Sequence, residues 1–335
     1  MKQFFKNIVS LYKIIIKFIT VDIWNININD IRGAKAKLIR YLKVALLTAK
    51  QSGNDKLGLY AVSLSYFTAL SIVPFVAAAF VVTGGFGLEK RLQELLLESF
   101  VENQETLKWI IEFARNIIKS SEKGLFGIIS FLCFIWLIVW LILNVEKCFN
   151  SIWKVEKSRS FTKRAAYYLG FIIIAPLVIT IFLSVSLVFN NALTSIGQGI
   201  GLKHFESISF VLQWAVFYGV VVVALFAMYK LIPNVKVNIV SAFNSSLITS
   251  IAFIVVQYLY LETQLMVSRL NAVYGAFAAI PLFLIWLNIS WTIILIGAEI
   301  SYAFQYIREN SDSHESDEQI NSRIIENLNE IKDKS

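Results

Sequence analysis

A single acidic residue inside the last long apolar stretch marks the clearest place for chemistry. Asn288, Thr292 and Glu299 are separated by four and seven residues, so an α-helix presents all three on one face. Lipid cannot satisfy these polar groups, and we expect the face to point into a helix bundle or toward water. The carboxylate could bind a cation, relay a proton or contact a lipid headgroup. The structural alternative is a pairing with Lys163 or Arg164 that joins two helices.

Two other apolar stretches carry polar side chains that could line the same interior or a substrate path. Small hydroxyl residues let helices approach closely and hydrogen-bond across the contact, so helix packing is the alternative explanation. A proline in such a helix would also leave a carbonyl oxygen free near the middle of the membrane. The residues concerned are Ser63, Tyr66, Ser71, Pro74, Asn244 and Thr249.

A group of charged residues is expected on the cytoplasmic side of the membrane. Glu146 lies at the end of the second apolar stretch, and Lys163 and Arg164 precede the third. Asn144 is expected to join them. Tyr and Trp residues nearby, such as Trp153 and Tyr168, are interpreted as interfacial or packing residues.

The sequence gives no support for an enzyme. It contains no GxSxG, HExxH, GxxxxGK[ST] or GxGxxG motif and no paired cysteine cluster. Two distant histidines and two cysteines in or beside apolar residues offer no metal-ligand spacing. We therefore expect no catalytic residue, no metal and no cofactor.

The elements that must position these residues are membrane-spanning helices. The chain has 335 residues, of which 57% are hydrophobic and 16% charged, whereas soluble domains are about 25% charged. Its apolar residues form blocks long enough to cross a hydrocarbon core of about 30 Å. We predict an all-α fold with six spans, at roughly 59–83, 124–146, 166–190, 208–231, 239–261 and 275–304.

The distribution of Lys and Arg predicts the orientation. Residues 1–58 contain 11 basic and 3 acidic residues, and residues 147–165 contain six basic residues. On the alternate side, residues 191–207 and 262–274 contain one basic residue each. Because cytoplasmic loops carry the excess of Lys and Arg, we expect both termini in the cytoplasm. The net charge of +8 then belongs beside lipid headgroups and not along a nucleic-acid groove.

Three regions flank this transmembrane domain, which we place at residues 59–305. Residues 1–58 form a cytoplasmic region with basic amphipathic helices at 2–19 and 34–50. An external amphipathic segment covers 84–123, with helical periodicity over 88–118 and a break near Glu102–Gln104. Residues 306–335 form an acidic cytoplasmic tail, expected to be disordered with a weak helix at 320–332.

Three blocks of sequence together resemble one family. Ala61–Tyr66 with Leu70–Pro74 forms the first block, Tyr229–Val237 the second, and Tyr274–Trp286 with Leu295–Glu299 the third. In this order and spacing they resemble the signatures of the YihY/BrkB family of bacterial inner-membrane proteins. The chain departs from the family at Ser241–Asn244, where members often carry a Gly-Ala pair.

The resemblance implies a six-helix protein of the bacterial inner membrane but no mechanism. The family was once labelled ribonuclease BN, a label that the cytoplasmic segments do not support. Family members are associated with envelope integrity and serum resistance. We favour a transporter-like role in handling lipid or another envelope component. A cation/proton antiporter and a structural or scaffolding protein of the envelope are the alternatives. Expected partners are membrane lipids, a lipid or ion substrate, a second copy of the chain or an envelope protein, and not nucleic acid.

Overall fold

The computed structural model consists of helices and the turns that connect them, within the part of the chain that it describes. The described residues are 17–18, 22–26, 31, 33–99, 104–121, 125–156, 159–200, 205–268 and 280–309. The helices, in chain order, are α2 (Ile23–Asn25), α3 (Ala34–Asn54), α4 (Leu57–Gly85), α5 (Glu89–Ser99), α6 (Gln104–Ser121), α7 (Leu125–Ile152), α8 (Phe161–Ile200), α9 (Phe205–Leu231), α10 (Ile239–Ser268) and a C-terminal helix (Ile280–Glu309).

Six of these helices are long and apolar enough to cross a membrane. They are α4, α7, α8, α9, α10 and the C-terminal helix, and each covers the described part of one of the six predicted apolar stretches. The predicted starts at residues 124 and 275 lie outside the described residues. Large apolar side chains cover much of their outer surface; Val223 of α9, for example, is 66% exposed. Side chains of this kind suit a lipid environment, and the fold is that of a multi-pass membrane protein.

Five of the described helices contribute to the principal core. One cluster contains completely buried residues from each of them: Leu64 of α4, Phe149 of α7, Tyr229 of α9, Ala242 of α10 and Leu295 of the C-terminal helix. Polar contacts join the same helices: Ser71 Oγ of α4 donates to the Leu137 carbonyl of α7 at 3.3 Å, and Trp291 Nε1 donates to Thr68 Oγ1 at 2.9 Å. The hydroxyl groups of α4 therefore serve helix packing.

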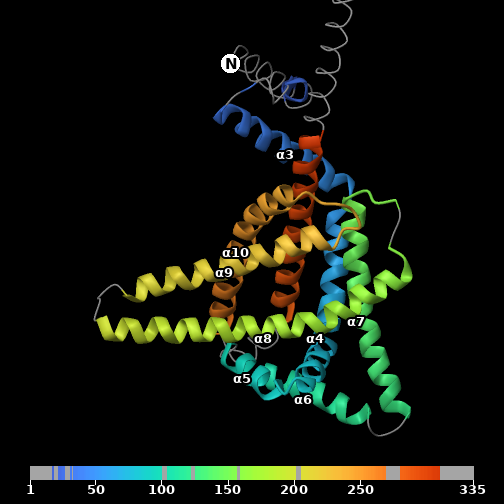
Figure 1. The fold of residues 1–335 in the computed structure, drawn as a ribbon, viewed down its shortest axis with the longest axis vertical. Coiled ribbons are helices and arrows are strands. Elements are labelled where there is room, and N and C mark those ends of the chain that lie inside the picture. Colours follow the sequence, from blue (N-terminus) through green and yellow to red (C-terminus); the bar gives the residue numbers. More distant parts are fainter. Residues whose placement is uncertain are drawn as a thin grey trace, which may run out of the picture.

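The helices α8 and α9 differ in direction from the others. Figure 1 shows α4, α7 and the C-terminal helix running along the long axis of the molecule, while α8 and α9 form an antiparallel pair across it. The candidate span of α8 covers Thr162–Ile181, the first half of a helix of 40 residues. Hydropathy gives the length of an apolar segment and not its tilt, so this arrangement could not be predicted.

The predicted amphipathic segment between the first two spans forms α5 and α6. Leu92 of α5 and Ile111 of α6 pack on Ala79 and Phe80 at the end of α4. Arg115 of α6 also links α6 to α5, because it donates a hydrogen bond to Glu89 Oε1 at 2.8 Å. The break expected near Glu102–Gln104 falls on residues 100–103, which lie between the described ends of the two helices.

At the opposite end of the bundle, α3 packs against the end of the C-terminal helix (Figure 1). Val44 and Leu47 of α3 contact Ala303, Phe304 and Ile307. We call this region the α3 end. The predicted amphipathic stretch 34–50 is thus helical, whereas the helix predicted over 2–19 and the tail after residue 309 lie outside the described residues, apart from residues 17–18.

Candidate functional site

A glycine fixes the register of the C-terminal helix against α9 and α10. A Cβ atom added at Gly297 would overlap the Tyr229 hydroxyl and the Thr249 side chain. Ser245 Oγ donates a hydrogen bond to the Gly297 carbonyl oxygen, and the Tyr229 hydroxyl donates to the Ile294 carbonyl at 3.2 Å. Only glycine permits this approach, and it sets the position of the acid two residues further along the chain.

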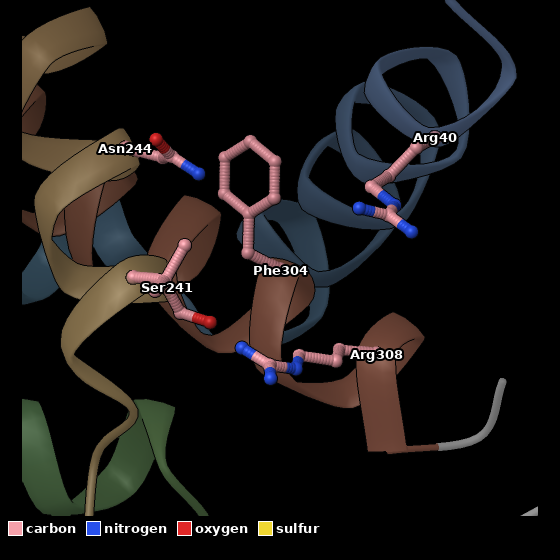
Figure 2. A pocket seen from close by; sticks show the side chains of 6 residues that line it. Arg40, Ser241, Asn244, Phe304 and Arg308 are labelled. Carbon is pink, nitrogen blue, oxygen red and sulfur yellow. The ribbon is translucent and has the colours of Figure 1, made fainter. Parts of the chain in front are cut away.

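The predicted polar residues of α10 lie in two different environments. Thr249, which is 2% exposed, donates to the Ser245 carbonyl at 2.8 Å and packs beside Gly297. Asn244 is half-buried and, with Ser241, lines a pocket at the α3 end (Figure 2). The buried part of the face is helix-packing surface, and its beginning borders a cavity.

Glu299 is completely buried, as expected for an acid on an inward face. Its carboxyl group interacts with two other ionisable groups, the Asp55 carboxyl group and the Lys154 ammonium group. Even so, neither Glu299 oxygen has a hydrogen-bond partner of good geometry within the described part of the chain. The expected pairing with Lys163 or Arg164 does not form: Arg164 contacts Glu146 instead, and Lys163 is exposed.

Further buried oxygen atoms without hydrogen-bond partners lie at the end of α3, which contacts Glu299 through Asp55. Gln51 Oε1, Ser52 Oγ and Asp55 Oδ2 are buried and unpaired at the end of α3, within the described residues. Gln51 also interacts with Tyr302, which lies one turn after Glu299. We call Gln51, Ser52, Asp55 and Glu299 the carboxyl site.

Two turns in unusual backbone conformations hold the flanks of the carboxyl site. α3 closes with a hydrogen bond from the Asp55 N–H to the Gln51 carbonyl at 2.8 Å, and Lys56 follows with φ 53°. After α7, Lys154 has φ 50°, and its Nζ lies 5.6 Å from the centre of the Tyr302 ring. Left-handed backbone is uncommon for residues other than glycine, and such strain is concentrated at functional sites.

The chemistry of the carboxyl site follows from its donor set. The buried Glu299 carboxyl group loses the stabilisation that water gives to its charge, and either a proton or a bound cation can compensate for this loss. A cation could bind both carboxyl groups together with the neighbouring oxygen atoms. Oxygen ligands of this kind suit hard cations and not metals that prefer nitrogen or sulfur.

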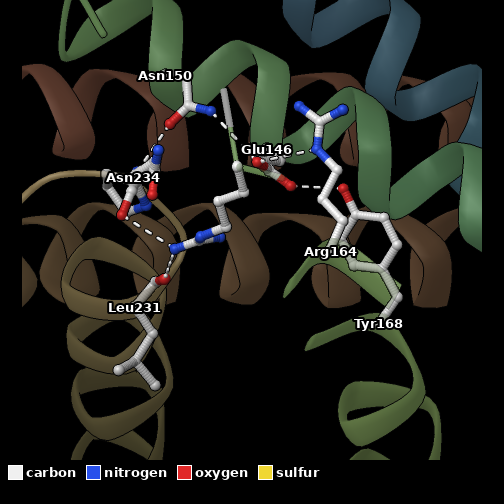
Figure 3. A network of polar contacts seen from close by, with 8 residues as sticks. Glu146, Asn150, Arg164, Tyr168, Leu231 and Asn234 are labelled. Atoms are coloured by element: carbon white, nitrogen blue, oxygen red, sulfur yellow. Dashed lines mark hydrogen bonds and ion pairs between the residues drawn. The ribbon is translucent and has the colours of Figure 1, made fainter. Parts of the chain in front are cut away.

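Glu146, the other buried acid of the described spans, is in a contrasting environment (Figure 3). The Tyr168 hydroxyl donates to its Oε2 at 2.5 Å, Arg164 Nε donates to its Oε1 at 3.4 Å, and Asn150 Nδ2 lies 3.5 Å from the same oxygen. Each carboxylate oxygen is satisfied. The predicted charge cluster of Glu146, Lys163 and Arg164 is brought together only in part, because Arg164 contacts Glu146 whereas Lys163 is exposed.

The Glu146 network extends to the turn after α9. Asn150 Oδ1 accepts a hydrogen bond from the Asn234 backbone N–H at 2.8 Å. Arg159 donates to the carbonyl oxygens of Leu231 at 2.9 Å and Pro233 at 3.2 Å. The network therefore joins α7, the start of α8 and the 232–235 turn, which is what a structural acid is expected to do.

The remaining predicted residues lie apart from the carboxyl site. Thr292 donates to the Asn288 carbonyl within its own helix at 2.8 Å, and both side chains are half-buried. In α4, Ser71 and Pro74 are buried and Ser63 is half-buried. Tyr66 is 59% exposed and does not face the bundle interior.

Sequence reasoning missed the partners of Glu299. Asp55 and Lys154 lie in connections between helices, and neither falls inside an apolar stretch where an acid or base stands out. The only available signal was that Asp55 is one of 3 acidic residues in a segment with 11 basic ones. The sequence indicates an interfacial or packing role for Tyr168 and gives no sign of its hydrogen bond to Glu146, which is the shortest that this acid accepts.

The fold and these sites define a polytopic α-helical membrane protein whose described residues include one buried acid with hydrogen-bond partners, Glu146, and one without, Glu299. A family model described as "Virulence factor BrkB" matches residues 48–320. The chain belongs to this family, in agreement with the resemblance carried by its three sequence blocks.

Curated relatives are described only as membrane proteins. A UPF0761 membrane protein of Haemophilus influenzae (strain 86-028NP) is 26% identical over 282 residues, which cover 81% of this chain and 98% of the relative. One from Paraburkholderia xenovorans (strain LB400) is 29% identical over 79% of this chain and 61% of the relative. One from Psychrobacter sp. (strain PRwf-1) is 29% identical over 76% and 46%, respectively. This chain thus spans less than two thirds of some relatives. No solved structure matches the chain.

Proposed function

We propose that this protein exchanges protons for a hard monovalent cation across the membrane, with the carboxyl site as the binding site. The observation that carries the proposal is the complete burial of Glu299 with both carboxyl oxygens unpartnered beside Asp55. An ionisable group in such a position inside a membrane protein is a functional candidate by default. A proton and a cation compete for the same oxygen atoms, and this competition is the basis of exchange.

Comparison with Glu146 argues against a purely structural role for Glu299. This fold satisfies a structural acid with a tyrosine, an arginine and an asparagine. Glu299 has none of these partners in the described part of the chain. An unpartnered buried carboxylate costs several kcal/mol in a low-dielectric interior, so its retention favours a role that uses the proton.

The carboxyl site lies close to an exposed charged side chain. The site lies at the α3 end of the bundle, where Lys154 is exposed and still interacts with Glu299. Basic residues are concentrated in 1–58 and 147–165, and we propose on this basis that the α3 end faces the cytoplasm of a bacterial inner membrane. We assign no catalytic role to the chain.

Ion flux into proteoliposomes tests the proposal. Vesicles are loaded at acidic pH with a pH-sensitive dye, and Na⁺, Li⁺ or K⁺ is added outside. We expect the parent protein to raise the internal pH on addition of at least one of these cations, and Glu299→Gln and Asp55→Asn to abolish the response. Glu309→Gln is the matched control, because Glu309 lies on the same helix and is exposed. A parent protein without flux, or a Glu299→Gln variant with full flux, would overturn the proposal.

A role in handling lipid is the second candidate. It is favoured by a pocket at the α3 end that contains two arginine side chains. If proteoliposomes show no cation-dependent proton flux but exchange fluorescent phospholipid between leaflets, lipid handling replaces ion exchange as the function. If neither occurs and cross-linking captures a stable envelope partner, the scaffolding role is correct.

A further inference from the structure

A pocket of about 270 Å³ opens between three elements at the α3 end. Its lining comes from α3, from the first turns of α10 and from the last turns of the C-terminal helix. Figure 2 shows Phe304 between Asn244 and Arg40, and below it Ser241 with the Arg308 guanidinium group turned toward it. Val240 completes the lining. This volume accommodates a phosphate group with part of the molecule that carries it.

The charged groups of the pocket are both positive. Arg40 belongs to α3 and Arg308 to the C-terminal helix, so two elements far apart in the sequence each contribute one guanidinium group to the lining. Arg308 donates a hydrogen bond to the neutral Asn238 Oδ1 at 3.4 Å. Within the described residues, Arg40 forms no ion pair. Guanidinium groups bind phosphate oxygens in a bidentate geometry, and this favours a phosphate ligand.

The beginning of α10 adds to the positive potential. α10 starts at Ile239 and runs for 30 residues, and Asn238 Oδ1 caps it by accepting the Val240 N–H at 2.9 Å. Ser241 and Asn244 of the first two turns border the pocket. A helix N-terminus favours an anion because its unpaired N–H groups and its dipole both point toward it.

The lining also has an exposed apolar part, and this distinguishes between sources of phosphate. Val240, which lines the pocket, is 55% exposed, and the preceding residue, Ile239, is 62% exposed. A soluble phosphate ester gains nothing from these side chains, whereas the acyl chains of a lipid can lie along them. The pocket is also at the end of two candidate spans, the level at which headgroups are found.

We propose that this pocket binds the phosphate of an anionic phospholipid, with Arg40 and Arg308 contacting the phosphate oxygens and Asn244 and Ser241 contributing hydrogen bonds. The proposal names the lipid class for the second candidate function and does not depend on ion exchange. The two can fail separately. A lack of lipid binding at this pocket contradicts the present proposal, whereas a lack of lipid movement between leaflets contradicts the lipid-handling function.

Lipid titration of the purified full-length protein in a neutral detergent tests the proposal. The probes are phosphatidylglycerol, phosphatidylcholine and inorganic phosphate, and the readout is the rise in melting temperature on binding. We expect phosphatidylglycerol to stabilise the parent protein at much lower concentrations than the other two probes. In Arg40→Gln/Arg308→Gln the apparent affinity for phosphatidylglycerol should fall by about tenfold or more, the effect of losing one or two charge-assisted hydrogen bonds.

Matched controls separate a specific site from general charge. Lys35→Gln/Lys37→Gln removes two exposed positive charges from the same helix, α3, and should leave the titration unchanged. If the double arginine variant does not fold, Arg40→Gln alone removes an exposed side chain and should weaken the affinity by a smaller factor. Equal losses in the lysine and arginine variants, or parent-like binding in the arginine variants, would overturn the proposal. Stabilisation by inorganic phosphate as strong as that by phosphatidylglycerol would overturn the assignment to lipid.

Discussion

Replacing Gly297 by alanine should destabilise the contact that positions Glu299. The added methyl group would meet the Tyr229 hydroxyl and the Thr249 side chain, which leave it no space. Overpacking of this kind costs about 1–3 kcal/mol. The hydrogen bonds to the Gly297 and Ile294 carbonyls would also be strained, at about 0.6 kcal/mol each in a membrane protein. The helix preference for alanine over glycine returns about 1 kcal/mol. The expected net loss is about 1–3 kcal/mol.

Thermal unfolding in detergent, followed by tryptophan fluorescence, measures this effect. At about 2–4 °C per kcal/mol, Gly297→Ala should lower the melting temperature by several degrees. Gly219→Ala on α9 is the matched control, because nothing lies within 4 Å of its added Cβ, and it should melt at the parent temperature or slightly above. Thr249→Ala combined with Gly297→Ala should recover part of the loss, since the two atoms of Thr249 that obstruct the methyl group are removed. If Gly297→Ala melts like the parent, the close approach of the two helices is wrong.

Two further predictions concern polar groups with well-defined partners. Tyr168→Phe removes the 2.5 Å hydrogen bond to Glu146 and should lower the free energy of unfolding by about 1–3 kcal/mol. The control Tyr167→Phe changes an exposed neighbour and should leave the free energy of unfolding almost unchanged. Equal effects of the two substitutions would contradict the hydrogen-bond network around Glu146. Burial lowers the pKa of Lys43, whose ammonium donates to the Ile26 carbonyl at 2.7 Å. The unfolded chain therefore binds the proton more tightly, and stability should rise as pH increases from the lowered pKa toward the ordinary lysine value. Lys43→Met should remove that rise, and an unchanged pH profile of unfolding would refute it.

The candidate spans and the amphipathic elements were predictable because each depends on local sequence. A run of apolar residues long enough to cross the hydrocarbon core gives the six long helices, and the apolar periodicity over 88–118 gives α5 and α6. The burial of Glu299 was predictable from local sequence as well, because it is a polar residue within an apolar helix and shares a helical face with Asn288 and Thr292. These features need no knowledge of which helix lies beside which.

The partners of the acids were not predictable, because they depend on tertiary contacts. Asp55 and Glu299 are 244 residues apart in the sequence, and only the packing of α3 on the C-terminal helix brings them together. Arg164 could pair with either buried acid by charge alone, and the fold places it beside Glu146. The direction of α8 and α9 likewise depends on contacts that hydropathy does not contain.

The account depends most on the claim that Glu299, beside Asp55, holds an exchangeable proton that a cation can displace. Infrared difference spectroscopy of the protein in lipid measures this directly, by following the carbonyl band of a protonated carboxyl group as Na⁺, Li⁺ or K⁺ is added at constant pH. We predict that at least one cation decreases this band in the parent protein and that the change is absent in Glu299→Gln. A parent protein without a cation-dependent band, or a Glu299→Gln variant that retains it, would contradict the assignment.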